Sequence, residues 1–441
     1  MNKLSCQLLL GVYLLFGSFH VFSQSTTDLN FSCKEAIEFG MQQNKKLKIQ
    51  NVKTDIAGFS IKETRNEQLP SLKYHTGFHV LTNLNQYENG FLHAPTTYHT
   101  PRFKYDFTLD AEIPIYEGGI IKNEIIKKEA EERVAKWRLR KDQKDFRLQI
   151  ISAYLHVLHI EEQQALLISK LKEDSLIIAQ TESLKRNGVV TQNEVLRTQL
   201  QLSNHKMALT EWNNEKAIVE HEIKTILGIT EHVLFSANTS DLLVEKDKDV
   251  PQVQFDEVFE QNEGLQIAKE ELFISKQNKK LIKANALPKI SAGAEYGLNY
   301  PNFMFFPPQE HLYSIGMVGF NFVMPLDQLL KNKTKVATAN KQIEIAHLEI
   351  EEKEEAIYHE VFKAEKMLEE ANDKITIANQ AILQAEENYR IVKKKYLNHL
   401  SLITELIDAD NALLEAQSQK IALDINKQIK YYQLQYILGN I

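Results

Sequence analysis

Hydrophobic and polar residues alternate along two stretches near the start of the chain, over residues 71–84 and again over 103–115. A period of two is typical of a β-strand whose two faces meet different surroundings. Each stretch keeps alternating for about 13 residues, whereas strands of soluble proteins usually span about 5 or 6. We therefore predict two membrane-spanning strands with an apolar face toward lipid. A hairpin half-buried on a soluble core is the alternative.

The same pattern returns in the second half of the chain, over residues 289–300 and 312–324, which makes four strands in two hairpins. Backbone groups inside a membrane must all be hydrogen-bonded, so only a closed barrel is allowed there, and a barrel filled by side chains needs about 8 strands. Two copies of the chain would supply eight strands and three would supply twelve. Only the larger number begins to leave a water-filled lumen, so the strand count predicts an oligomer.

Segments rich in Glu, Lys, Gln, Ala and Leu, and nearly free of Gly and Pro, flank these strands. Their composition predicts helices over about 46–68, 119–185 and 192–227 in the first half, and over about 264–286, 329–397 and 404–438 in the second. The longest would reach about 100 Å, and helices of that length are stable only when they pack along their whole length. Runs of mixed charge on these helices are expected to face water.

Short motifs mark an internal duplication. The Leu-Pro pair at 69–70 recurs at 287–288, and the Leu-Gly pair at 227–228 recurs at 438–439. Each half reads helix, strand, strand, long helix, tip, long helix. We therefore predict a mainly α protein with a β-barrel part, divided into a first repeat over 24–228, a surface connector over 229–254 and a second repeat over 255–441.

The start of the chain predicts export from the cytoplasm. Lys3 precedes an apolar run over 8–22 that is too short for a spanning helix, so we expect a signal peptide over 1–23, cleaved after Ser23. Cys33 would be the one remaining cysteine, which excludes an internal disulfide. The net charge is −7 with both signs interspersed, so no basic face is available for nucleic acid.

Motifs in a fixed order carry a resemblance to a known family. They are the Pro-Ile-Tyr-Glu-Gly-Gly at 114–119, the Arg-Asn-Gly at 186–188 and the Glu-Val-Leu at 194–196, together with the duplication. The chain resembles the TolC-like outer membrane efflux family over nearly all of its mature length. The resemblance implies a homotrimer in the outer membrane of a Gram-negative cell, with a 12-stranded barrel continued by a 12-helix periplasmic tunnel. It also implies docking on a periplasmic adaptor, or membrane fusion protein, of an inner-membrane pump.

The resemblance further implies the residues of the tunnel entrance. The tips that join the long helices would dock on the adaptor, and they comprise Asn187, Gly188, Val189, Val190 and Thr191 in the first half and Asn398, His399, Leu400, Ser401 and Leu402 in the second. Tyr396 falls on the gating tyrosine of the family, Glu405 and Asp408 on its constriction acids, and Glu194 on the acid of its gate.

Two departures from the family's entrance pattern affect the expected gate. His399 stands where the family commonly has Gly, and Ser401 where it has an arginine. We still expect a contact between Tyr396 and Glu194. Copies of Glu405 and Asp408 would make an acidic ring that attracts cations; the alternative is that both are ordinary surface acids near a helix start.

Other candidate groups add little chemistry. His75 and His79 share the polar face of a strand, where lumen residues are the favoured interpretation, and His156 and His159 have a spacing seen in metal sites. No nucleotide, nucleophile or zinc motif is found, so we predict no enzyme, no metal and no cofactor. The leading prediction is a passive export duct. A channel for protein secretion, a metal-ion efflux duct and a periplasmic coiled-coil scaffold are the alternatives.

Overall fold

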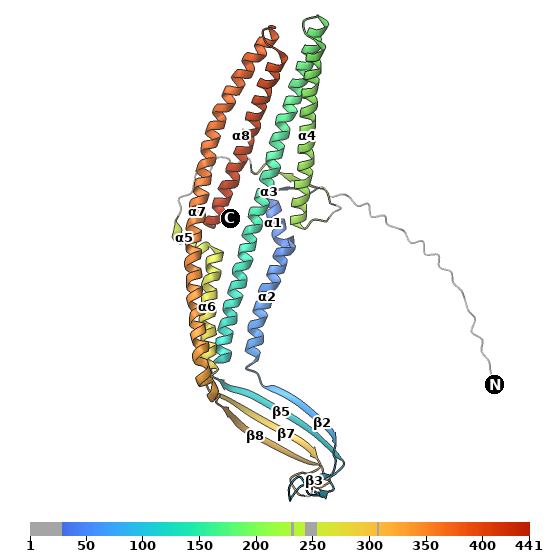
Figure 1. Cartoon of the computed structure of the whole chain (residues 1–441), viewed down its shortest axis with the longest axis vertical. Helices are drawn as coiled ribbons and strands as arrows, with labels where there is room; N and C mark the ends of the chain where they lie inside the picture. The colour runs from blue at the N-terminus through green and yellow to red at the C-terminus, as the bar shows by residue number, and fades with distance from the viewer. Residues whose placement is uncertain (1–28, 231–232, 243–253, 307) are drawn as a thin grey trace, which may run out of the picture.

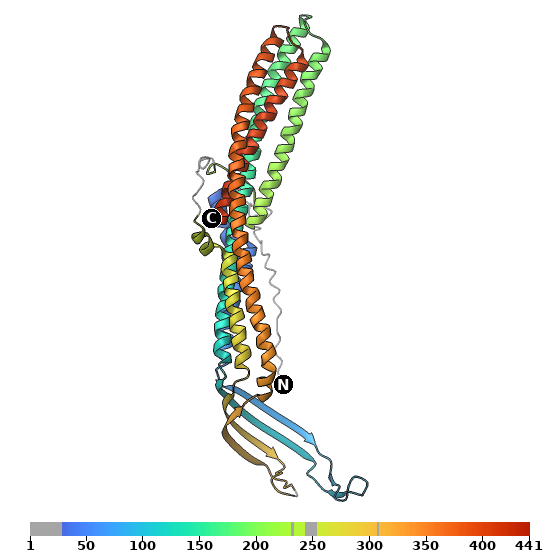
Figure 2. The same ribbon diagram turned by 60° about the vertical axis from the view of Figure 1, so that its left-hand side comes forward.

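The protein is a long rod of helices with a small sheet at one end (Figures 1 and 2). The computed structural model describes residues 29–230, 233–242, 254–306 and 308–441, so the expected signal peptide lies outside the described residues. The helices are α1 (Cys33–Gln43), α2 (Lys45–Asn66), α3 (Ile120–Arg186), α4 (Gln192–Leu227), α5 (Phe255–Gln261), α6 (Glu263–Ala284), α7 (Leu326–Leu397) and α8 (Ile403–Leu438).

Two helices, α3 and α7, run the whole length of the rod, and shorter helices flank them (Figure 1). Next to the sheet the helices lie in the order α2, α3, α6, α7, and in the half away from the sheet the order is α4, α3, α8, α7. The first half of the chain thus contributes the long helix α3 and its neighbours α2 and α4, and the second half contributes the long helix α7 and its neighbours α6 and α8. Among the described residues, no helix combines the length and apolar composition needed to cross a membrane.

The sheet joins the two halves of the chain. Its antiparallel strands lie in the order β2 (Ser71–Val80), β5 (Phe103–Glu117), β7 (Lys289–Tyr300) and β8 (Tyr313–Val323). The register aligns Tyr74, Leu109 and Tyr296 in one row, and the next row aligns Lys73, Asp110 and Glu295. Over β2, β5 and β7 one face of the sheet is therefore apolar and the other polar, because alternate residues of a strand point to opposite faces. The last strand, β8, carries apolar residues on both faces, such as Phe320 on one and Met317 on the other.

The first strand is shorter than the alternation predicts. Its ladder ends at Val80, opposite Phe103, rather than at residue 84. Pro101 lies just before the partner strand and has no N–H with which to extend the ladder. The chain instead forms a separate small hairpin of β3 (Leu84–Gln86) and β4 (Thr96–Tyr98) at the far end of the sheet (Figure 1).

A compact apolar core lies at mid-height of the rod. It is built mainly from α1, α3 and α4 and includes the fully buried Ile150, Tyr154 and Ile223. The parallel pair of β1 (Leu29–Ser32) and β6 (Phe235–Asn238) covers it, and the Tyr154 hydroxyl donates to the Phe31 carbonyl at 3.0 Å. The region predicted as a surface connector therefore contributes a strand, because its apolar residues pack on this core. Residues 243–253 of that connector lie outside the described residues.

Candidate functional site

The two tips, at the end of the rod opposite the sheet, share one backbone design (Figure 1). After α3, Gly188 has a φ of 72° and the Val189 N–H donates to the Leu184 carbonyl at 2.9 Å. After α7, His399 has a φ of 62° and the Leu400 N–H donates to the Lys395 carbonyl at 2.8 Å. Both are Schellman ends, in which the left-handed residue is usually glycine. The duplication of the sequence is thus visible in the geometry of the tips.

Histidine at this left-handed position strains the second tip. A left-handed backbone costs a residue with a Cβ roughly 1–2 kcal/mol, and glycine avoids this cost. Glycine also makes the unfolded chain more flexible, which lowers the stability of the folded state by about 0.4–1 kcal/mol. We therefore expect His399→Gly to raise the free energy of unfolding by up to about 1 kcal/mol. Chemical denaturation of the purified protein measures this. Gly188→Ala is the matched control and should lower stability; a loss of stability in His399→Gly would contradict the assignment.

Apolar side chains are exposed at both tips. The exposed fractions are 47% for Val189, 77% for Leu400 and 66% for Leu402, and the adjoining Asn187 and Asn398 are also exposed. Clustered exposed apolar groups with a polar rim are a common mark of protein–protein contact. The tips therefore have the surface chemistry of a docking site.

The two predicted constriction acids lie one helical turn apart on α8, close to its start. Glu405 and Asp408 are both exposed. Glu405 accepts a hydrogen bond from the Ser401 hydroxyl, the residue found where an arginine was expected. Within one protomer these acids face solvent, so they can form a ring only when several copies meet.

The predicted tyrosine is buried but has a different partner from the one expected. Tyr396 is 4% exposed, and its hydroxyl pairs with the Thr181 hydroxyl of α3 at 3.3 Å. Glu194 instead caps its own helix: its carboxylate accepts from the Thr191 N–H at 3.5 Å. The expected contact between Tyr396 and Glu194 is therefore not formed, because the acid satisfies the start of α4. Burial and the nearby Glu194 charge raise the pKa of Tyr396.

A layer of buried charges, which the sequence analysis missed, lies below the tips. Lys170 of α3 forms an ion pair with Asp410 of α8, and each side chain is only 5% exposed. Asp174 of α3 accepts from Nδ1 of His205 of α4 at 2.7 Å, and both are similarly buried. Ionised groups away from water are stable only when paired in this way. This layer is the most buried ionic cluster that we find among the described residues of the tip half.

Glu173 extends the buried layer to α7. Its carboxylate accepts from the Tyr389 hydroxyl at 2.5 Å, from Lys393 Nζ at 2.6 Å and from Lys170 Nζ at 3.0 Å. Burial disfavours its charged form, but the three donors outweigh burial and lower the pKa of Glu173 to about 2. For Lys170, burial opposes the charge in the same way, and Asp410 and Glu173 together raise its pKa above the ordinary value. Both groups are therefore charged at neutral pH.

Comparison with known proteins identifies the family. A sequence profile described as "outer membrane efflux protein" matches residues 40–229 and 255–440. The chain belongs to the outer membrane efflux protein family. The TolC-like resemblance seen in the motifs is confirmed, as are the outer-membrane location and the mainly helical two-repeat fold. No curated protein sequence matches the chain.

Solved structures of channels share the fold of this efflux protein. CusC is 16% identical, with a TM-score of 0.78 over 93% of this chain and 92% of that one. The outer-membrane channel OprN is 16% identical, with a TM-score of 0.76 over 93% and 90% of the two chains. VceC of Vibrio cholerae is 14% identical, with a TM-score of 0.72 over 92% and 96%. The family and these neighbours are channel proteins, and at these identities the structures show the fold alone.

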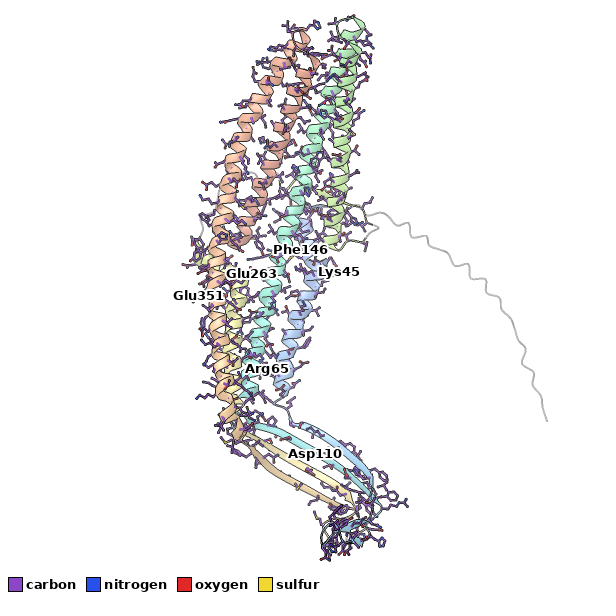
Figure 3. All side chains as sticks on the ribbon, viewed as in Figure 1. Lys45, Arg65, Asp110, Phe146, Glu263 and Glu351 are labelled. Atoms are coloured by element: carbon purple, nitrogen blue, oxygen red, sulfur yellow. The ribbon has the colours of Figure 1, made fainter. Side chains whose placement is uncertain are left out.

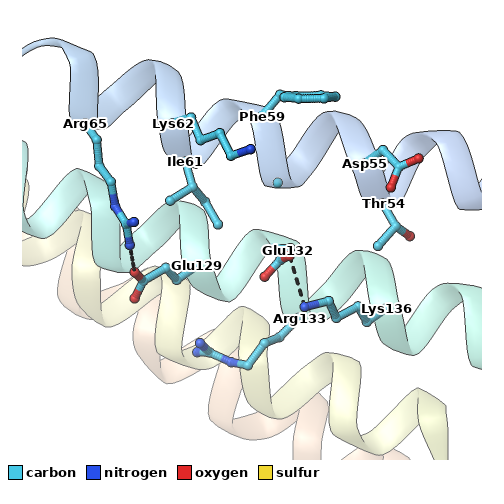
Figure 4. Close-up of a pocket in the computed structure, with 11 residues that line it drawn as sticks. Thr54, Asp55, Phe59, Ile61, Lys62, Arg65, Glu129, Glu132, Arg133 and Lys136 are labelled. Carbon is cyan, nitrogen blue, oxygen red and sulfur yellow. Dashed lines mark hydrogen bonds and ion pairs between the residues drawn. The ribbon is translucent and has the colours of Figure 1, made fainter.

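A groove of about 770 Å³ opens between α2 and α3 at the sheet end of the efflux protein. Figure 4 shows the ion pair between Arg65 and Glu129, at 3.1 Å, which joins the two helices across the groove. Lys136 pairs with Glu132 within α3 at 2.9 Å. The Arg65–Glu129 pair therefore helps to hold α2 against α3, whereas the Lys136–Glu132 pair stabilises α3 itself.

The histidine pair noted in the sequence lies on α3 of the efflux protein. The rings of His156 and His159 are 6.5 Å apart, and His159 packs edge-on against Trp212 at 5.4 Å. His156 Nε2 lies 3.9 Å from a Glu215 carboxylate oxygen. In the described part of the chain, no group of three His, Cys, Asp or Glu residues is arranged to hold a metal ion.

Proposed function

We propose that three copies of this efflux protein assemble into one continuous export duct that spans the outer membrane and crosses the periplasm. The observation that carries the proposal is the open sheet. Among the residues that the structure describes, its edge strands β2 and β8 have no partner on their outer sides, and over β2, β5 and β7 one face is apolar while the other is polar. Pairing β8 of one copy with β2 of the next would close three four-stranded sheets into a 12-stranded barrel. Closure would give the backbone N–H and C=O groups of both edge strands hydrogen-bond partners, which a sheet inside a membrane requires.

The helical part has matching open sides. The edge helices are α2 and α4 on one side and α7 on the other. An apolar stripe with helical spacing is exposed on α2 at Ile49, Val52, Ile56 and Phe59, and α7 exposes Ile345, Leu348, Tyr358 and Phe362. Stripes of this kind pack against a neighbouring helix. Contact between the α7 stripe and the α2 stripe of the next copy would close a helical tunnel below the barrel.

The tips are the proposed docking site for a periplasmic adaptor of an inner-membrane pump. They lie at the end of the rod opposite the sheet, which places them farthest from the outer membrane (Figure 2). Their exposed Val189, Leu400 and Leu402 supply apolar contact area. We expect the duct to be passive, with the pump supplying the energy.

Purification from outer membranes tests the proposed function. We expect a trimer that changes its migration on heating and that produces single-channel currents in planar bilayers. A water-soluble monomer that never inserts into bilayers would refute the proposal.

The acids of the entrance should make the duct sensitive to multivalent cations. Three copies each of Glu405 and Asp408 would crowd six carboxylates around a narrow opening, which attracts cations. We expect divalent or trivalent ions to block the wild-type current, and Glu405→Gln with Asp408→Asn to weaken that block at least about tenfold. Bilayer recordings at increasing ion concentration measure it.

A matched control for the cation experiment removes two acids elsewhere. Glu351 lies on α7 at mid-height (Figure 3), and Glu355 follows it one turn later; both are exposed. Glu351→Gln with Glu355→Gln should leave the block unchanged. If multivalent cations blocked the current of the entrance variant as strongly as that of the wild type, the entrance acids would not be the cause of the block.

A further inference from the structure

Two histidines converge on one carboxylate on the polar face of the sheet, toward the end that lies away from the helices (Figure 1). His75 and His79 of β2 flank Gly77, which is paired with Asp106 of β5. The Nε2 atoms of His75 and His79 lie 4.0 Å and 3.8 Å from the carboxylate oxygens of Asp106. Lys104 Nζ lies 3.8 Å from the same carboxylate. One acid is thus surrounded by a permanent cation and two groups that become cations when they are protonated.

The glycine between the two histidines makes room for this cluster. A Cβ built on Gly77 would lie 2.9 Å from an Asp106 carboxylate oxygen and 2.9 Å from His79 Nε2. The carboxylate and the imidazole therefore occupy the space that a side chain at residue 77 would fill. The Asp106 side chain is 15% exposed, whereas those of His75 and His79 are 73% and 57% exposed. A solute on this face of the sheet would meet the imidazoles before the acid.

The polar face carries the opposite charge closer to the helices. The next row of the sheet aligns Lys73 with Asp110 and Glu295, and the row after it places Glu112 opposite Ser71. Asp110 is labelled in Figure 3. These two rows hold three acids and one lysine, so their charge is negative. The polar face therefore has an acidic zone next to the helices and a zone beyond it whose charge depends on the two histidines.

The neighbouring strands place few other ionisable groups beside the histidines in the part of the chain that the structure describes. On β7, the residues opposite Asp106 and Thr108 are the uncharged Asn299 and Gly297. The strand β8, which would lie on the other side of β2 in the closed barrel, contains no acid, lysine, arginine or histidine over residues 313–323, and its one phenol is Tyr313. Beyond Lys104 the chain adds one further permanent cation, Arg102. The charge of this zone therefore changes chiefly through the two imidazoles.

We propose that His75, His79 and Lys104 form an anion-attracting ring inside the barrel when the two imidazoles are protonated. This inference rests on the proposed function, because a ring exists only where three copies surround a lumen. Imidazole ordinarily changes its charge between about pH 5 and 8. At the upper limit the charges of Lys104 and Asp106 cancel. At the lower limit each copy gains two positive charges, and three copies gain 3 × 2 = 6.

The ring would act on the charge of the solutes that leave the duct. Charged side chains that line a pore favour ions of the opposite sign, and a lumen walled by protein focuses their field. The protonated ring would therefore attract small anions and the carboxylate or phosphate groups of exported molecules, and it would repel cations. With neutral imidazoles, the acidic zone next to the helices would dominate and the barrel would favour cations.

Reversal potentials of trimers in planar bilayers test the ring. The KCl gradient is kept at or below about 0.1 M, where the Debye length is about 10 Å or more and the charges act across the lumen. We expect the ratio of K⁺ to Cl⁻ permeability of the wild type to fall at least about threefold between pH 8 and pH 5.5. His75→Asn with His79→Asn should abolish most of this fall. Asp106→Asn should lower the ratio already at pH 8, because the Lys104 charge is then no longer balanced.

Two control variants separate the ring from other titratable groups of the duct. His93 and His99 are exposed and flank the small strand β4, beyond the main sheet. His93→Asn with His99→Asn removes the same number of imidazoles and should keep the wild-type fall. Glu405→Gln with Asp408→Asn should also keep it, because these acids lie at the opposite end of the rod.

The outcomes distinguish the ring from the proposed function. A fall in the ratio that is lost only in the variant lacking His75 and His79 would support the ring. An unchanged fall in that variant would overturn it, and so would an equal loss in the variant lacking His93 and His99. Channels that conduct with a ratio independent of pH would overturn the ring and leave the duct standing. If neither the wild type nor any variant conducted, the proposed function would fall and the ring with it.

Discussion

Arginine in place of Leu109 is expected to prevent assembly of the protein in the outer membrane. Leu109 lies in the apolar row of the sheet between Tyr74 and Tyr296, and its side chain is 51% exposed. That row would face the lipid of a closed barrel. An arginine near the bilayer midplane costs about 2–4 kcal/mol, and a trimer would carry three of them. The sum is comparable with the whole stability of an ordinary folded domain, about 5–15 kcal/mol.

The neighbouring residue supplies the control for Leu109. Thr108→Arg places the same charge one position away on the same strand, but on the polar face, between His75 of β2 and Gly297 of β7. We expect this variant to assemble as the wild type does. The measurement is the amount of heat-modifiable trimer in outer-membrane fractions. Equal amounts of trimer in both variants would mean that the two faces of the sheet are assigned wrongly.

The faces of the sheet could be predicted from the sequence because the two-residue period belongs to each strand separately. The pairing of β5 with β7 could not, although it joins the two halves of the chain. Nothing in β5 or β7 specifies its neighbour, since both strands carry the same alternation. The order β2, β5, β7, β8 follows from the tertiary packing of the helices above, which brings α2, α3, α6 and α7 side by side.

At the tips, the sequence predicts the positions of the turn residues but not the contacts between helices. Gly188 and His399 could be placed by motif, and the structure gives both the same left-handed conformation. The partner of Tyr396 could not be predicted, because Thr181 is an ordinary helical residue with no local signal. The docking and gating roles of the tip residues remain predictions, which the proposed experiments test.

The buried charges were missed because mixed charge on a helix ordinarily faces water. Lys170 and Asp174 are nevertheless part of an inner stripe of α3 with spacings of three and four residues. The buried residues of this stripe are Ile160, Gln163, Leu167, Lys170, Asp174 and Thr181. A charged residue within such a stripe is a signal that composition alone does not reveal. Its partners, His205 and Asp410, lie on other helices and become apparent only when the helices are packed.

Adding one methyl group at Gly40 should destabilise the core at mid-height, although alanine is the better helix former. Gly40 lies within α1, and a Cβ built there would overlap the Phe146 ring and approach a Leu227 methyl group to 2.9 Å. Phe146, labelled in Figure 3, is 4% exposed and has little room to move. Overpacking of this kind costs about 1–3 kcal/mol, which exceeds the gain in helix propensity of about 1 kcal/mol.

The same substitution in the next helix, α2, is expected to stabilise the protein instead of destabilising it. A Cβ at Gly58 in α2 would meet only a Glu132 oxygen at 3.7 Å, so Gly58→Ala should raise the free energy of unfolding by about 0.5–1 kcal/mol. Denaturant unfolding of both variants measures the contrast. Phe146→Leu should recover part of the stability lost in Gly40→Ala, since the smaller side chain vacates the overlapping space. If Gly40→Ala were as stable as Gly58→Ala, the close packing of α1 on α3 would not be what holds the two helices together.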